Sequence, residues 1–78
     1  MEKDDDDVDV HVTVEGNAII VTLPGTIFRA VYRKEPDAPW LIASEIRDDP
    51  DRRISRWTFR ARAWTTANEK ARELGWIV

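Results

Sequence analysis

The sequence VDVHVTVEGNAIIVTL, residues 8–23, begins with valine at every second position and a polar residue between each pair. This two-residue period is typical of a β-strand with one buried face, because successive side chains of a strand point to opposite sides. Gly16 and Asn17 tolerate the positive φ that a tight turn requires, and residues 18–23 form a second run rich in β-branched side chains. The stretch therefore predicts a β-hairpin.

Two more strands are expected after the hairpin. Pro24-Gly25 breaks the second strand, and residues 26–34 then alternate in the same way. Residues 35–39 contain two prolines, which lack a backbone donor and fix φ, so this segment is expected to be a loop. The fourth strand is expected at residues 40–47, and the Asp- and Pro-containing segment 48–51 ends it.

The segment from Ile54 to Leu74 is compatible with two structures. One long helix would place a mostly apolar stripe on one face, at spacings of three and four residues. The stripe comprises Ile54, Trp57, Ala61, Trp64, Asn68, Ala71 and Leu74. Two features oppose a single helix: Phe59 would point to the polar face, and Thr66–Glu69 has the capping-box pattern that normally starts a helix.

The alternative is a strand through residues 57–61 followed by a short helix over 67–74. The long helix is favoured because so short a helix would be unstable without strong packing. The sequence alone leaves open whether residues 54–64 are helix or strand. In both structures Gly75 suits the left-handed position after a helix, and Trp76 is expected to fold back over the last turn.

These elements predict an α+β fold, a four-stranded antiparallel β-meander (β-β-β-β-α) with one C-terminal helix packed on one face of the sheet. Strand order stays open, although a meander is the default for such short connections. Residues 1–7 carry a run of like charge and are expected to form a disordered acidic leader. Residues 8–78 are expected to form a single domain, because the chain is too short for a second core.

The composition favours a protein that is not an enzyme. The chain has no cysteine and a single histidine, His11, so neither a zinc site nor a nucleophile with its base has the residues it needs. The three glycines are each explained by a turn or a helix end, which leaves no phosphate-binding loop. We therefore expect no cofactor and no metal. The absence of a signal peptide or a membrane-spanning run favours a cytoplasmic location.

One helix can cover only one side of the sheet, so the other side is expected to stay open. The residues expected to face the helix are Val10, Val12, Val14, Ile19, Val21, Leu23, Phe28, Ala30, Tyr32, Trp40, Ile42 and Ile46, against Trp57, Trp64 and Leu74. The opposite face then mixes aliphatic side chains with arginines, as recognition surfaces do, although scattered surface aliphatics on strands are also common. The candidate interaction surface consists of Ile20, Ile27, Arg29, Val31, Arg33, Leu41 and Arg47.

Two classes of function follow from such a surface. The favoured one is a protein-interaction module, in which the open face or an edge strand pairs with another protein chain. The simplest partner is a second copy, because a homodimer would also support the small core. The other class is a nucleic-acid-binding domain that uses the sheet arginines to contact backbone or bases. No membrane partner is expected.

Part of the sequence also resembles a family that belongs to the second class. Residues 28–33, Trp40 and residues 43–48 together resemble the first two strands of the AP2-type DNA-binding domain. That family has a three-stranded sheet against one helix and reads the major groove from the sheet. The resemblance, over about a quarter of the chain, implies contacts from Arg29, Arg33, Trp40 and Arg47. The chain departs from the family pattern at the insertion 36–39, at the extra Ser44 and in its valine-rich first hairpin.

Overall fold

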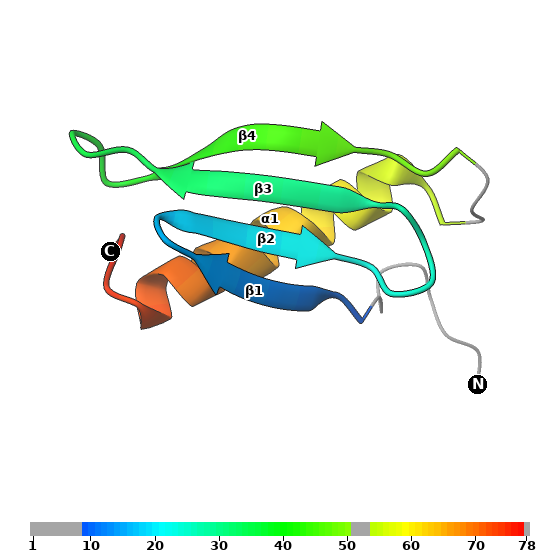
Figure 1. Ribbon diagram of the computed structural model, residues 1–78, viewed down its shortest axis with the longest axis horizontal. Helices are drawn as coiled ribbons and strands as arrows, with labels where there is room; N and C mark the ends of the chain where they lie inside the picture. Colours follow the sequence, from blue (N-terminus) through cyan, green and yellow to red (C-terminus); the bar gives the residue numbers. More distant parts are fainter. Residues whose placement is uncertain (1–8, 51–53, 78) are drawn as a thin grey trace.

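The computed structural model describes residues 9–50 and 54–77, and the predicted leader at residues 1–7 lies outside this range. The described part contains β1 (His11–Glu15), β2 (Ala18–Thr22), β3 (Arg29–Lys34), β4 (Leu41–Arg47) and α1 (Arg56–Glu73). The strands are antiparallel neighbours in the order β1-β2-β3-β4, which makes β1 and β4 the edges. α1 crosses obliquely behind the sheet (Figure 1). The predicted α+β meander with its C-terminal helix is confirmed.

The predicted hairpin joins β1 to β2 through a turn that needs glycine. Glu15 pairs with Ala18, so Gly16 and Asn17 are the loop residues. Gly16 has a φ of 61°. In the described ranges, only glycines have positive φ. Positive φ at the first loop position alone defines a type II′ turn, whose twist matches that of the two strands. The pairing then continues from this turn to His11 without a shift, so the alternation survives along all of β1.

β3 begins at Arg29, later than the expected start at Thr26, because side chains bind the backbone before it. The Thr26 hydroxyl donates to a carbonyl in the preceding turn at 2.7 Å and accepts the Phe28 N–H at 3.1 Å. The Ile27 N–H donates to the carboxylate of the buried Asp49 at 3.0 Å. These contacts satisfy backbone groups that would otherwise need a strand ladder.

α1 is continuous from Arg56 to Glu73, so the long helix is confirmed over the alternative of a strand and a short helix. Ser55 caps its start: the Ser55 hydroxyl accepts the Thr58 N–H at 3.1 Å. The capping-box pattern at Thr66–Glu69 therefore lies inside the helix instead of at its start. A cap in the sequence is a local preference, and burial of one continuous helix face overrides it.

The C-terminal end of α1 is closed as expected. Gly75 has a φ of 79°, and the Trp76 N–H donates to the Ala71 carbonyl at 2.8 Å, which is the Schellman arrangement. Trp76 is partly buried against the main core. In the described ranges, no helix is both long enough and apolar enough to cross a membrane.

The helix face that contacts the sheet differs from the predicted stripe. The buried residues lie at every fourth position and are Phe59, Ala63, Ala67 and Ala71. Phe59, expected on the polar face, stacks on Phe28 with ring centroids 4.7 Å apart. The large members of the predicted stripe are exposed, namely Trp57, Trp64 and Leu74. The predicted stripe, chosen by its spacing, shares only Ala71 with the buried row. A row of alanines lets the helix lie close to the sheet, whereas a row of tryptophans would hold it away.

β4 changes faces at a β-bulge. Val31 of β3 pairs with Glu45, but the next residue, Tyr32, pairs with Ala43, so Ser44 is the extra residue. Side chains alternate strictly along a strand, and one inserted residue therefore exchanges the faces of everything on one side of it.

The exchange corrects the predicted positions of three residues. Leu41, expected on the open face, is buried in the main core. Ile42, expected to face the helix, pairs with Arg33 and lies on the open side, 43% exposed. Trp40, expected in the same inner set, is also exposed. Periodicity predicted these positions wrongly because it assumed an unbroken strand.

Candidate interaction surfaces of the sheet

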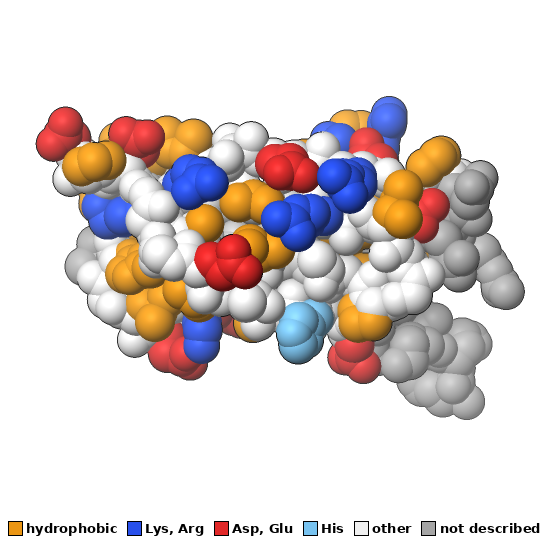
Figure 2. All heavy atoms as spheres, in the orientation of Figure 1, with side chains coloured by type: hydrophobic (Ala, Val, Ile, Leu, Met, Phe, Trp, Pro, Cys, Tyr) orange, Lys and Arg blue, Asp and Glu red, His pale blue; other side chains and the backbone are white. Residues whose placement is uncertain are grey.

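The open face of the sheet has a small apolar centre surrounded by charge (Figure 2). Ala18, Ile20 and Val31 form a cluster separate from the main core. Ile20 is only 9% exposed and Val31 only 4%, although α1 packs on the other face. Ile20 and Val31 thus lie on the predicted face, but they offer a partner little apolar area.

The arginines on this face are engaged with neighbouring side chains. Arg29 Nε and Arg47 Nη2 each lie 3.6 Å from the Glu45 carboxylate. Arg33 donates from Nη1 to the Asn17 amide oxygen at 3.0 Å and from Nε to the hydroxyl of the bulge residue at 3.3 Å. These contacts join β3 to the β1–β2 turn and to β4, so the guanidinium groups are engaged with neighbouring side chains of the sheet.

The seven residues of the predicted surface are therefore not one surface. The three arginines share the open face with Ile20 and Val31. Ile27 is exposed but precedes β3, where its backbone is tied to Asp49. Leu41 belongs to the main core on the opposite side.

A second set of exposed apolar side chains lies on the helix side of the molecule, and the sequence argument missed it. We call it the β4 flank and define it as Ile46, Trp57 and Trp64. Ile46 pairs with the buried Ala30 and so faces the helix side, yet all three flank residues are exposed, Trp57 to 62%. The sequence signal that could have predicted it is the row of alanines in α1. These small side chains let the helix pack closely on the sheet, and the tryptophans on neighbouring rows then stay exposed.

Charged groups fasten β4 to the helix next to this flank. The Asp48 carboxylate, just after β4, accepts two hydrogen bonds from Arg60, at 2.8 and 3.2 Å. The Arg60 and Arg56 guanidinium groups lie 5.2 and 4.9 Å from the centroid of the Trp57 ring. Trp64 contacts the Tyr32 ring edge-on at 5.5 Å. Burial raises the pKa of the Tyr32 phenol, and the charge of Arg60 opposes the rise.

The two edges of the sheet present different backbones to solvent. β4 contains the bulge at Ser44 and, beside it, Glu45 and Arg47, and both are devices that keep an edge from pairing with other chains. β1 pairs with β2 without a bulge and contains neither lysine nor proline. In the part of the chain that the structure describes, no strand pairs with the outer side of β1.

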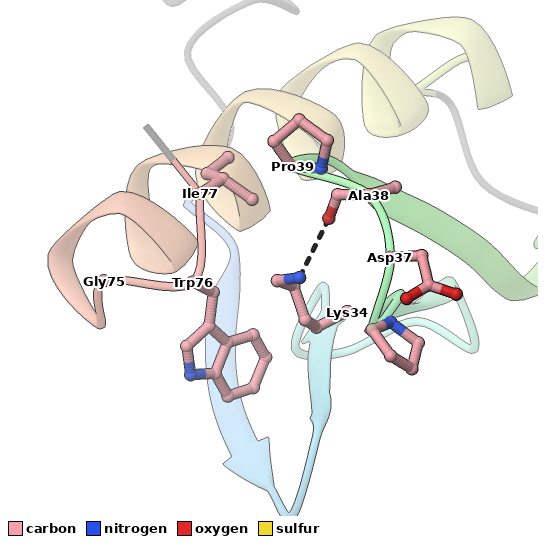
Figure 3. A pocket seen from close by; sticks show the side chains of 8 residues that line it. Lys34, Asp37, Ala38, Pro39, Gly75, Trp76 and Ile77 are labelled. Carbon is pink, nitrogen blue, oxygen red and sulfur yellow. Dashed lines mark hydrogen bonds between the residues drawn. The ribbon is translucent and has the colours of Figure 1, made fainter.

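A shallow pocket of about 360 Å³ lies between the β3–β4 loop and the C-terminal segment (Figure 3). Its walls are the loop residues 36–39 on one side and residues 75–77 on the other. Lys34 lies between them, and its ammonium group donates to the Ala38 carbonyl at 2.8 Å. The charge of Lys34 therefore holds the loop together, and a structural role explains the residue.

No protein-family model, curated protein or solved structure matches this chain. The AP2-type resemblance therefore stays a prediction. Among residues 9–50 and 54–77, no group of three His, Cys, Asp or Glu side chains is placed to hold a metal ion. The surfaces with the strongest claim to a function are thus the arginine-bearing face, the β4 flank and the β1 edge.

Proposed function

We propose that this protein is a small non-enzymatic protein-interaction module that self-associates through an edge of its sheet. The β1 edge supports this proposal most directly, because it has no bulge and its outer side has no partner strand among the described residues. An edge strand presents a row of N–H and C=O groups that form a template for another chain. A 78-residue chain also has a small core, to which a second copy would add buried area.

The edge is favoured over the open face, because the side chains of the open face are already buried or engaged with one another. Ile20 and Val31 are nearly covered, so a partner on this face would gain little apolar area. The arginines would also have to give up their contacts with Glu45 and Asn17. Displacing polar contacts without replacing them costs free energy, which reduces the affinity of such a complex.

Sedimentation equilibrium across micromolar concentrations tests the proposal. The expected result is a mass that rises from one chain to two chains as concentration increases. Arg33→Glu is the control, because Arg33 lies on the inner strand β3: the variant removes its side-chain contacts with Asn17 and Ser44 but leaves the backbone of β1 in place, and the mass should not change. A strict monomer over the whole range would contradict self-association, and a loss of association in Arg33→Glu would move the interface to the open face.

Nucleic-acid binding is the second candidate, and one observation favours it. Arg29, Arg33 and Arg47 share the face that α1 leaves open, which is the face that the AP2-type resemblance implies. Glu45 lies 3.6 Å from two of these groups and reduces their field. A mobility-shift assay at low salt is the test, since backbone contacts are strongest there. Binding that is lost in Arg29→Ala and Arg47→Ala would support this function, and no shift at low salt would remove it.

A further inference from the structure

We infer that the partner at the β1 edge is a second copy of this chain, bound antiparallel with Thr13 opposite Thr13 of the second copy. The inference rests on the proposed function and makes it specific, because it names the edge, the partner and the register. The two sheets would join into one continuous sheet. A two-fold axis perpendicular to that sheet would place both α1 helices on the same side.

The hairpin geometry determines which backbone groups of β1 are free to pair. In a hairpin with a two-residue loop, the pair beside the loop exchanges both hydrogen bonds, and bonded and non-bonded pairs then alternate. Glu15 and Ala18 are the pair beside this loop. Glu15, Thr13 and His11 therefore direct their N–H and C=O groups toward β2, whereas Val12 and Val14 direct theirs outward.

Only some registers let these outward groups meet. Antiparallel pairing with Thr13 at the centre places Val12 opposite Val14 of the second copy, and both residues have outward backbone groups. The two Thr13 residues then form a non-hydrogen-bonded pair, in which side chains approach most closely. Threonine pairs are favourable at such positions.

The side chains of β1 are self-complementary in the same register. Val12 and Val14 are partly buried against the main core, so they would meet on the helix side and continue that core across the junction. His11 and Glu15 are exposed on the open side, and each would lie opposite the other residue type of the second copy. Neither side chain has a hydrogen-bond or ion-pair partner in the described part of the chain. The junction would supply one to both.

Neighbouring registers lose this complementarity. A shift by two residues toward the N-terminus places Asp9 opposite Glu15, which are like charges. The opposite shift places Val12 against Gly16 of the turn and leaves His11 beyond the end of the paired strand. Pairing centred on Thr13 is the register that uses all of β1.

The other edge favours a closed dimer over a fibre. Pairing β1 with β4 of the next copy would leave a free edge at each end and would continue without limit. The bulge in β4 and its charged neighbours, Glu45 and Arg47, oppose that pairing. Pairing β1 with β1 consumes both flat edges, so assembly stops at two chains.

Cysteine cross-linking tests the register, because the chain contains no cysteine of its own. In a non-hydrogen-bonded pair the Cα atoms are about 4.5 Å apart, within the range that a disulfide spans. Under a mild oxidant, Thr13→Cys is therefore expected to run at twice the mass of one chain on a non-reducing gel and to return to a single chain on reduction. Ser44→Cys, on the other edge, is the matched control and should stay monomeric.

Two further variants identify the register independently. His11→Cys alone and Glu15→Cys alone should not cross-link, because like positions are then offset by about 13 Å along the strands. An equimolar mixture of the two variants should cross-link. A mixture of His11→Cys with Thr13→Cys should give no product that joins the two different variants.

Each outcome separates the inference from the proposed function. A concentration-dependent dimer that does not cross-link at Thr13→Cys would overturn the register and leave self-association standing. Cross-linking at Ser44→Cys instead would transfer the interface to β4. If Thr13→Cys fails to cross-link and sedimentation shows a monomer, both the inference and the proposed function are wrong.

Discussion

β1 and β4 form the two edges of one sheet, yet they differ in flatness, charge and cover. β1 is unbroken, and its valines pack on the main core beside residues that face solvent. β4 is interrupted by a bulge at Ser44, and Asp48 just beyond it is tied to Arg60 of the helix. We expect a sheet with one regular edge and one bulged edge to pair through the regular edge. In the proposed assembly this asymmetry would allow a dimer and oppose a fibre.

The largest effect is expected inside β4, where the bulge exchanges two faces. Leu41→Ala should destabilise the monomer by about 2–5 kcal/mol, because it opens a cavity in the main core. Ile42→Ala should cost about 0.5 kcal/mol or less, because its side chain is largely solvent-exposed. Urea unfolding of the two variants measures the difference. Equal costs would mean that β4 runs without the bulge, and the contrast between the edges would disappear.

The next largest effect is expected from a lysine substitution on β1, compared with the same substitution on β4. Thr13→Lys would place two ammonium groups directly opposite each other in the dimer, and like charges in that position are destabilising. We expect the dimer to weaken at least about tenfold, equivalent to about 1.4 kcal/mol, without a change in monomer stability. Ser44→Lys should leave the dissociation constant unchanged. Sedimentation of both variants gives the comparison, and equal weakening would contradict the assignment of the interface to β1.

Alkaline pH should produce a smaller effect on the β4 side, where Tyr32 pairs with Ala43 beside the bulge. Burial raises the folded-state pKa of Tyr32 above its ordinary value of 10.0, and Arg60 partly opposes this. Above pH 10 the unfolded chain loses the phenol proton first, so stability is complete below that pH and falls as the pH rises toward the folded pKa.

Tyr32→Phe should remove that part of the alkaline loss of stability. Urea midpoints from neutral to alkaline pH test the expectation in both proteins. Because Tyr32 is the chain's only tyrosine, phenolate absorbance of the native protein reports its pKa directly. Titration at the ordinary value would contradict the raised pKa and the cover over this part of β3.

The smallest effect is expected at the ion pair between Asp48, just after β4, and Arg60 of the helix. Asp48→Asn should lower stability by about 0.5 kcal/mol, since its ion pair with Arg60 is partly exposed and solvent screens it. Thermal unfolding at low and high salt is the measurement, and the difference between the proteins should shrink in high salt. Asp37→Asn, in the exposed loop before β4, is the control. A loss of stability of the same size in Asp37→Asn would show that the change in net charge, and not the loss of the ion pair with Arg60, causes the effect.

The hairpin could be predicted from sequence because its signals are local. Alternating valines and a Gly-Asn turn depend on neighbouring residues only, and β1 keeps its register from the turn to His11. The outer positions of the open face followed from the same alternation, which places Arg29, Val31 and Arg33 together. The interface proposed for β1 likewise depends on residues that the sequence already places on a strand.

The position of Leu41 could not be predicted from periodicity, because the alternation along the strand does not mark Ser44 as an inserted residue, although Ser44 is extra against the AP2-type pattern. The bulge exists only through the pairing of β4 with β3. The β4 flank was missed for a related reason: the depth at which the helix rests depends on the sheet beneath it, and Ala63, Ala67 and Ala71 permit a close approach that exposes Trp57 and Trp64.

The sequence by itself determined the four strands, the turn of the first hairpin and the end of the helix at Gly75, and it left open whether residues 54–64 were helix or strand. Each depends on steric and hydrogen-bonding preferences between residues near one another in the chain. Only the tertiary structure decided which side of β4 faces inward and which row of α1 touches the sheet. Both are settled by pairing and packing between segments far apart in sequence, where one inserted residue or one narrow side chain changes which atoms meet.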